Sequence, residues 1–174
     1  MRERSATGSH YDLEPLRREP MSAKVLVVGA GPVGLTMAAE LARYGVPVRI
    51  VDKAAQRTDK SRALVLWSRT LELLDRASGS EPFVAAGHKV HAVNLVAGSQ
   101  LIARVPLGII ESAYAWALML PQSETERLLE IHLNRLGVQV ERQTELMSFD
   151  DVGGSVTSML RGADGAQERI ETDW

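Results

Sequence analysis

The stretch Val25-Leu-Val-Val-Gly-Ala-Gly-Pro-Val-Gly-Leu-Thr-Met-Ala-Ala-Glu-Leu-Ala42 decides the fold of this chain. An apolar run is followed by glycines in the spacing GxGxxG and then by a helical pattern. A second apolar run, Val48-Arg-Ile-Val-Asp52, ends in a carboxylate at the offset of about 20 residues that dinucleotide-binding βαβ units show. Because the glycine spacing alone is weak evidence, the prediction of such a unit depends on these flanking patterns.

Each position of the glycine-rich turn meets a separate physical requirement. Gly29 permits the tight turn out of the strand, and Gly31 has no Cβ, so the backbone can approach a pyrophosphate. Pro32 suits the first helical position, where no N–H is needed, and Gly34 lets the helix lie close to the strand. The free amides at this helix start, that of Val33 among them, and the positive end of the helix dipole then face the phosphates.

The rest of the unit follows from periodicity and position. A helix is predicted over residues 32–44, because apolar residues repeat at i, i+3, i+4 and i+7 from Leu35 and Gly45 is a natural stop. Asp52 ends the second strand, where its carboxylate can accept hydrogen bonds from an adenosine ribose, and Lys53 beside it is assigned to the same site. The alternative interpretation is a glycine-rich turn that packs a helix and binds no ligand.

Composition excludes several classes of protein. With 174 residues and 45% hydrophobic content, the chain can bury the core of one domain or slightly more. A net charge of −2 supplies no basic surface for nucleic acid or anionic lipid, and the longest apolar stretch, residues 113–120, is well below the ~18 residues of a membrane-spanning helix. The absence of cysteine excludes disulfides and a redox-active CxxC pair. We therefore expect a soluble, cytoplasmic protein without nucleic-acid or membrane partners.

Downstream of the βαβ unit, the sequence predicts a surface loop, two helices and a hairpin. The loop covers residues 53–61, and a helix over 68–77 has Ser68 as its N-cap, followed by a short helix at 82–86. Strand-like runs at 89–97 and 100–105 flank Gly-Ser, which is typical of a β-hairpin. A small antiparallel sheet at this place indicates a substrate-covering region.

The last third of the sequence predicts one more helix and strand of the parallel sheet and then an antiparallel sheet. Ser123-Glu-Thr-Glu126 has the pattern of a capping box and predicts a helix from there to Leu136, followed by a strand at 138–140. From Thr144 onward, three short runs separated by turn residues predict an antiparallel meander. Gly162-Ala-Asp-Gly165 is interpreted as the second of its turns.

Three blocks, in this order, resemble the FAD-dependent aromatic hydroxylases with the fold of p-hydroxybenzoate hydroxylase. They are residues 25–52, Ser61-Arg-Ala-Leu-Val-Leu-Trp-Ser-Arg-Thr-Leu-Glu-Leu-Leu74 and Leu120-Pro-Gln-Ser-Glu-Thr-Glu-Arg-Leu-Leu129. The resemblance implies that Arg62 contacts the FAD diphosphate and that Gln122 lies near the ribityl chain. Otherwise Arg62 is a solvated loop charge and Gln122 an ordinary residue of a helix start.

The resemblance also implies an activity, which is NAD(P)H-dependent hydroxylation of a small aromatic substrate, phenolic or polyketide-derived, with FAD as cofactor. No catalytic residue is assigned, because the flavin carries the chemistry. Metal and hydrolase sites are not expected: His88 and His91 point to opposite faces of a predicted strand, and no serine, histidine and acid have a nucleophile pattern. An ordinary NAD-binding dehydrogenase is the alternative enzyme class.

The fold class is therefore α/β, a Rossmann-like FAD-binding domain of the glutathione-reductase type with an antiparallel meander and part of a substrate-region sheet. Residues 1–20 are expected to be a disordered leader, either an expression remnant or an upstream extension. The first part of the FAD-binding domain covers 21–87, the substrate-region strands 88–121 and the continued FAD-binding domain 122–174. Family members are much longer, so the chain is expected to be an N-terminal part. The alternative is an incompetent fragment that needs a partner, a C-terminal half or a homo-oligomer.

Overall fold

The predicted βαβ unit is present in the computed structural model, which describes residues 23–57, 63–77, 79–151 and 153–174. Strand β1 (Val25–Val28) leads through the glycine-rich turn into α1 (Pro32–Arg43), which returns to β2 (Val48–Asp52). The two strands pair in parallel, from Val25 opposite Val48 to Val28 opposite Val51. The predicted leader, residues 1–20, lies outside the described residues.

Helix α1 packs on this sheet through the predicted apolar stripe. Leu35 and Ala38 are fully buried, and Ala39 is nearly so. The helix ends where expected, with Tyr44 as C-cap and Gly45 at a φ of +73°, a left-handed conformation that glycine adopts without strain. Local sequence therefore determines both ends of this helix.

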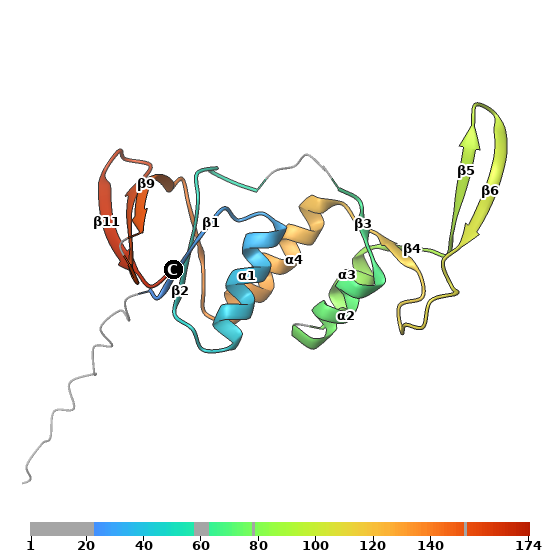
Figure 1. Ribbon diagram of the computed structural model, residues 1–174, viewed down its shortest axis with the longest axis horizontal. Coiled ribbons are helices and arrows are strands. Elements are labelled where there is room, and N and C mark those ends of the chain that lie inside the picture. Colours follow the sequence, from blue (N-terminus) through green and yellow to red (C-terminus); the bar gives the residue numbers. More distant parts are fainter. Residues whose placement is uncertain (1–22, 58–62, 78, 152) are drawn as a thin grey trace, which may run out of the picture.

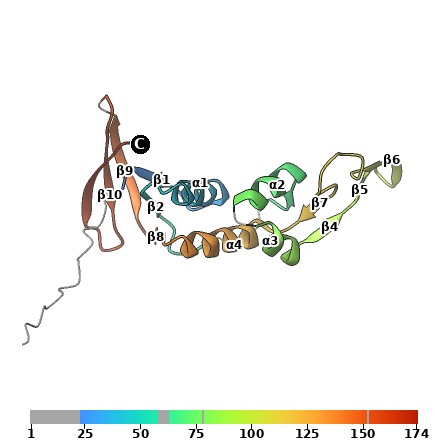
Figure 2. The same cartoon turned by 90° about the horizontal axis from the view of Figure 1, so that it is seen from below.

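A second crossover adds the third strand of the parallel sheet. Helix α4 (Gln122–Arg135) lies beside α1 and leads to β8 (Val140–Arg142), which pairs in parallel with β2 to give the order β1-β2-β8 (Figures 1 and 2). The strand begins at the last residue of the predicted range 138–140, because Val138 belongs to the turn after the helix, where its N–H bonds to Leu133 O.

The middle of the chain forms a separate antiparallel sheet. Strand β7 (Ala117–Met119) lies between β3 (Val65–Leu66) and β4 (His88–Val90), and the helices α2 (Ser68–Ala77) and α3 (Glu81–Ala86) connect the outer strands. β3 and β7 have no counterpart among the sequence expectations, since each is too short to show periodicity.

The strand predicted over residues 89–97 is wrong as a single element. It divides at His91, because its first part pairs with β7 while β5 (Ala92–Ala97) pairs with β6 (Gln100–Pro106). The predicted hairpin is confirmed, with Gly98 at a φ of +58° in its turn, and it projects from the end of the molecule (Figure 1). Its strands carry exposed apolar side chains, including Val96 and Ile102 at 63% and 66%.

Two helix starts differ from the sequence expectations. Ser68 is the first residue of α2 rather than its N-cap, since Leu71 N–H donates to Trp67 O and the serine hydroxyl donates to Tyr114 O. The capping box at Ser123 and Glu126 does not form. Helix α4 begins earlier, with Pro121 as N-cap and without a side-chain cap, and the carboxylate of Glu126 is buried beside Gln122.

The predicted meander is confirmed at the other end of the molecule. It consists of β9 (Glu145–Asp151), β10 (Val156–Arg161) and β11 (Gln167–Thr172), with β10 in the middle. Residues 162–165 form its second turn, in which Gly165 N–H donates to Gly162 O at 3.0 Å. The sequence interpretation of GADG as a turn is therefore correct.

One apolar core joins the parallel sheet to the middle of the chain. It holds residues of both regions, among them Val27, Leu35, Ile50, Leu71, Phe83, Leu118, Leu129 and Leu133. Helices α1 and α4 and the middle sheet therefore form one packed body rather than independent parts. None of the helices within the described ranges has the length and apolar character to cross a membrane.

Candidate functional site

The glycine-rich turn has the geometry that the sequence indicates. Gly29 has a φ of +99°, and its N–H donates to Val51 O at 2.8 Å, which ties the turn to β2. A Cβ on Gly34 would lie 1.9 Å from the carbonyl oxygen of Gly29, so only glycine allows this approach of helix and strand. Gly34 is therefore required for packing, independently of any ligand.

Gly31 has a different environment. It is the N-cap of α1, with an extended backbone at φ −79°, and a Cβ placed on it would meet no atom within 4 Å. No side chain caps the helix, Pro32 follows at the first position, and Val33 is 82% exposed. The first turn of α1 therefore opens onto free space with amides available to an anion.

Asp52 links the turn to the end of β2. Its Oδ2 accepts a hydrogen bond from Ala30 N–H at 2.7 Å, and its Oδ1 accepts one from Ala54 N–H at 2.8 Å. A carboxylate can accept about four hydrogen bonds, so these two leave positions for a ribose. Lys53, the next residue, is exposed.

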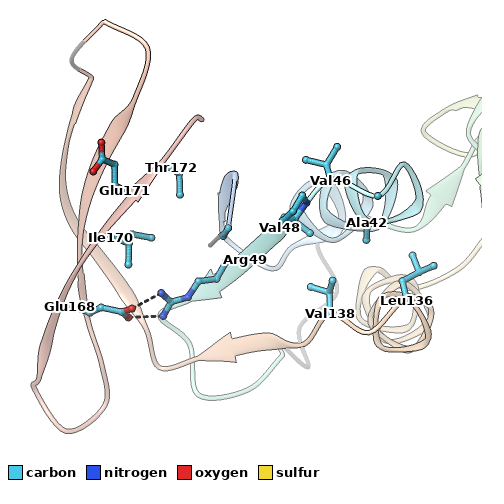
Figure 3. A pocket seen from close by; sticks show the side chains of 13 residues that line it. Ala42, Val46, Val48, Arg49, Leu136, Val138, Glu168, Ile170, Glu171 and Thr172 are labelled. Carbon is cyan, nitrogen blue, oxygen red and sulfur yellow. Dashed lines mark hydrogen bonds and ion pairs between the residues drawn. The ribbon is translucent and has the colours of Figure 1, made fainter. Parts of the chain in front are cut away.

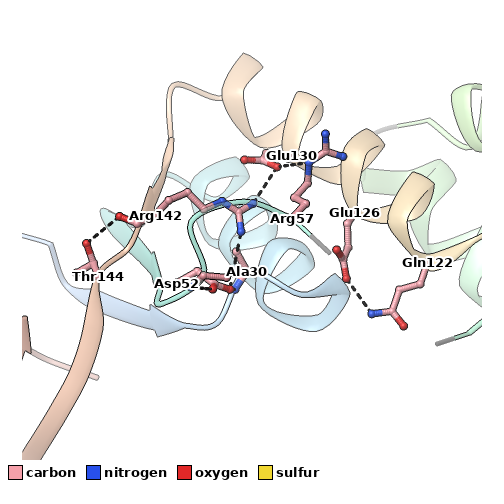
Figure 4. A network of polar contacts seen from close by, with 9 residues as sticks. Ala30, Asp52, Arg57, Gln122, Glu126, Glu130, Arg142 and Thr144 are labelled. Atoms are coloured by element: carbon pink, nitrogen blue, oxygen red, sulfur yellow. Dashed lines mark hydrogen bonds and ion pairs between the residues drawn. The ribbon is translucent and has the colours of Figure 1, made fainter. Parts of the chain in front are cut away.

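A row of alternating charges continues from Asp52 (Figure 4). Arg142 on β8 lies opposite Asp52 in the pairing with β2, and its Nη1 is 3.9 Å from Asp52 Oδ2. Its Nη2 donates to Glu130 Oε2 at 3.0 Å. Arg57 Nε lies 3.1 Å from the same Glu130 oxygen. The row ties α4 to the carboxylate that ends β2.

Sequence reasoning missed this row. A signal existed for Arg142, which comes two residues after the strand predicted at 138–140, because carboxyl ends of parallel strands meet at one edge of a sheet. Arg57 lies in a stretch predicted as loop and Glu130 on a predicted helix, and neither position carries a local signal.

A cavity of about 320 Å³ adjoins Asp52 at this edge. Its walls come from the ends of β1 and β2 and the start of β9, and consist of Val28, Gly29, Asp52, Lys53, Thr144, Glu145 and Leu146. A larger cavity, of about 930 Å³, lies at the opposite edge, where β2 begins and Arg49 bonds to Glu168 (Figure 3). Ligands of parallel α/β sheets bind outside the carboxyl ends of the strands, so the smaller cavity is the candidate site.

Gln122 begins α4, so it lies at the same edge of the sheet as the start of α1. Its side chain donates from Nε2 to Glu126 Oε1 at 2.8 Å, and its N–H donates to Ala63 O at 2.9 Å. The second bond brings the middle of the chain to the helix start, which the sequence could not show. Arg62 lies outside the described residues.

The described ranges contain no group of three or more histidine, cysteine, aspartate or glutamate residues placed to hold a metal ion. Among the described residues, the groups at the carboxyl edge are the amides of the first turn of α1, the carboxylates of Asp52 and Glu145, and the row of charges that continues from Asp52. Such a set can bind an adenosine and its phosphates, and it contains no side chain arranged as a nucleophile with its base.

Comparison with known proteins gives one family match. The family model of the FAD binding domain matches residues 22–174. Among curated proteins, the 6-methylpretetramide 4-monooxygenase of Streptomyces rimosus is 40% identical over 153 residues, which cover 87% of this chain and 27% of that protein. The chain spans less than a third of the length of the first relatives that it matches.

Two solved structures are similar to the whole described fold. The OxyS anhydrotetracycline hydroxylase from Streptomyces rimosus superimposes with a TM-score of 0.79 at 28% identity, over 88% of this chain and 31% of that one. The p-nitrophenol 4-monooxygenase PnpA from Pseudomonas putida gives a TM-score of 0.83 at 24% identity, over 88% and 40%, a similarity of fold alone.

Proposed function

Because the chain belongs to the family of FAD binding domains, we propose that it forms the adenosine- and diphosphate-binding part of an FAD-dependent monooxygenase that hydroxylates an aromatic ring. The observation that carries this proposal is the carboxyl edge of the sheet, where the glycine-rich turn bonds to the Asp52 carboxylate and both Gly29 and Asp52 line one cavity. The cofactor-binding residues of this proposal are Gly29, Gly31, Pro32, Val33, Gly34, Asp52 and Lys53.

The residues present fit the adenosine diphosphate half of FAD. The space in front of Gly31 accommodates a pyrophosphate within reach of the amides of Val33 and Gly34. Asp52 has acceptor positions left for the ribose hydroxyls, and the cavity wall of Val28 and Leu146 offers apolar contact to a planar base. In this proposal Arg62 contributes to diphosphate binding and Gln122 to the ribityl chain.

When bound, FAD would supply the redox chemistry that takes electrons from NAD(P)H and uses oxygen to hydroxylate the substrate. This chain's own residues bind and orient the adenosine end, and none of them needs to move a proton in the reaction. An aromatic substrate of phenolic or polyketide type is proposed, since the relative at 40% identity is named for such an activity on 6-methylpretetramide.

The experiment that tests the proposal replaces Gly31 by valine. A Cβ there meets no protein atom within 4 Å, so we expect the variant to fold like the parent, with the valine side chain in the place proposed for the pyrophosphate. We expect ADP affinity measured by calorimetry to fall at least about tenfold, or ~1.4 kcal/mol, with an unchanged thermal midpoint. Equal ADP affinity in variant and parent would remove the basis of the assignment.

Gly34→Ala provides the contrasting variant. Its Cβ would collide with Gly29 O, so we expect a lower thermal midpoint. If the Gly31 variant folds but loses ADP binding, position 31 belongs to a ligand site. If the Gly34 variant has a lower thermal midpoint, position 34 is required for packing.

A further inference from the structure

The three acidic side chains of α4 have different partners. Glu124 and Glu130 each form ion pairs with arginines. Glu126 is only 4% exposed, and its carboxylate oxygen Oε1 accepts a hydrogen bond from the amide Nε2 of Gln122 at 2.8 Å. In the part of the chain that the structure describes, no ion pair reaches Glu126. Glu126 is therefore a buried acid that bonds to a neutral side chain.

The burial of this acid has a cost that its place on the helix does not require. Charged side chains are almost never fully buried unless they are paired, because water solvates them better than a protein interior does. Leu129 and Leu133, one and two turns further along the same side of α4, are buried in the apolar core. An apolar residue at position 126 would continue this stripe. The acid therefore fits a role that an apolar residue cannot perform, which is to accept a hydrogen bond.

This hydrogen bond determines which end of the Gln122 amide faces Glu126. The two residues are four positions apart, so they lie on one face of the helix. A carboxylate only accepts hydrogen bonds, so the amide nitrogen must face it and the amide oxygen must point away, as Figure 4 shows. The main chain is held as well, because Gln122 N–H donates to Ala63 O at 2.9 Å. Hydrogen bonds therefore hold both the backbone and the side chain of Gln122 before a ligand binds.

We propose that Glu126 is a positioning residue, which holds the Gln122 amide so that its oxygen Oε1 is presented to the hydroxyl groups of the ribityl chain. This inference rests on the proposed function, in which Gln122 lies at that chain. Hydroxyl groups can donate to an amide oxygen, and a side chain held in advance loses less conformational freedom on binding than a freely rotating one. Glu126 is itself buried, so it acts through Gln122 rather than by contact with the cofactor.

Positioning of Gln122 should affect one half of the cofactor only. ADP has no ribityl chain, so its affinity should depend on the glycine-rich turn and Asp52 and not on Gln122. FAD has this chain, so its affinity should depend on the Gln122 amide as well. The ratio of the two dissociation constants therefore separates positioning from a loss of stability, which would weaken the binding of both ligands.

Calorimetry of the 174-residue chain with ADP and FAD tests the proposal. In the parent, we expect FAD to bind at least about threefold more tightly than ADP. Glu126→Met removes the acceptor and a buried carboxylate, so the thermal midpoint should not fall. In this variant the preference for FAD should disappear, while ADP affinity should stay within about twofold of that of the parent.

Two further variants serve as controls for this measurement. Glu126→Gln keeps an oxygen acceptor of the same reach and should retain the preference for FAD. Glu124→Met removes a neighbouring acid of the same helix, which pairs with Arg127, and should also retain it. A preference for FAD that survives Glu126→Met, or that is lost equally in Glu124→Met, would overturn the proposal.

Hydrogen exchange of the Gln122 side-chain amide, followed by NMR, gives a readout that needs no ligand. The amide signal is identified by its absence in Gln122→Met. In the parent, it should exchange at least about tenfold more slowly than in Glu126→Met, since only the parent has the acceptor. Equal exchange in these two chains would overturn the proposal.

Failure of the proposed function would give a different result. A parent chain that binds neither ADP nor FAD would refute that function, and the amide exchange would still decide whether Glu126 holds Gln122. A parent chain that binds ADP and FAD equally would preserve the adenosine site and overturn the proposal, because the positioned amide would then add nothing at the ribityl chain.

Discussion

At the scale of single residues, Asp52 organises the backbone at the carboxyl edge of the sheet. Its two oxygens bond to backbone amides of the glycine-rich turn and of the segment after β2, so one carboxylate holds both in place. Arg142 then fixes the position of this carboxylate relative to α4 through Glu130. Asp52 is thus a structural centre even before a ligand binds.

We predict that Arg142→Met weakens ADP binding by about 0.5–1.5 kcal/mol, less than the about 1.5–3 kcal/mol expected for Asp52→Ala. The arginine acts by holding the carboxylate that accepts the ribose hydroxyls. With 2′,3′-dideoxy-ADP in the calorimeter, the Arg142 variant should therefore match the parent. An undiminished loss for the dideoxy ligand would show that Arg142 does not act through the ribose.

His132 gives a prediction about pH. Burial lowers the pKa of its imidazole, with a further contribution from Arg135, and its Nε2 is buried without a hydrogen-bond partner among the described residues. The unfolded chain takes up this proton at about pH 6.5, whereas the folded chain resists it. The free energy of unfolding should therefore decrease as the pH falls below about 6.5.

Urea unfolding at several pH values checks this prediction. His132→Gln should remove the contribution of this imidazole to the decrease in the free energy of unfolding. His91→Gln, at an exposed position, should leave that contribution in place. The same pH dependence in the His132 variant and the parent would assign the decrease to other groups.

At the scale of elements, Arg49 links the meander to two strands of the parallel sheet. Arg49 on β2 donates to Glu141 on β8 at 2.6 and 2.7 Å. It also donates to Glu168 on β11 at 2.7 and 2.6 Å (Figure 3). Its side chain is only 23% exposed, and the hydrogen bonds lower the pKa of the Glu168 carboxyl. The meander provides Thr144, Glu145 and Leu146 near the cavity, so this link bears on the site.

We predict that Arg49→Met lowers the free energy of unfolding by about 1–2 kcal/mol, since it removes hydrogen bonds between charged groups and leaves two carboxylates unpaired. Arg161→Met is the control, because its pair with Glu145 lies within the meander and is more exposed, and it should change stability by less than about 0.5 kcal/mol. The effect should diminish as the pH falls below the ordinary glutamate value of about 4.3 and through the pKa of Glu168, which the bond from Arg49 lowers in the folded chain. Equal effects of both substitutions in urea titrations would contradict this role.

At the scale of the whole molecule, the described residues contain the contacts for one end of a dinucleotide and little for its other end. The glycine-rich turn, Asp52 and the 320 Å³ cavity lie together, while the hairpin β5–β6 projects with apolar side chains exposed. A two-stranded hairpin is only marginally stable by itself. The hairpin therefore contributes no enclosed surface for a flavin ring among these residues.

We predict that this 174-residue chain binds FAD no more than about tenfold more tightly than ADP, and riboflavin without measurable affinity. An exposed flavin ring forgoes apolar burial of roughly 25 cal/mol per Å². Calorimetry with the three ligands gives the comparison, and the purified protein should be colourless. Stoichiometric, tightly held FAD with a structured flavin absorption band would contradict it.

The sequence by itself determined the βαβ unit, the positions of its glycines and Asp52, the hairpin and the meander, because each depends on contacts between residues close in the chain. It failed at α4, where Pro121 starts the helix before the capping pattern, and at His91, where the strand changes partner. Only the tertiary structure decided that Arg142, Glu130 and Arg57 meet beside Asp52 and that Trp174 pairs with β1. These contacts join residues far apart in sequence, and no local pattern records which partner a charged side chain or a strand edge will meet.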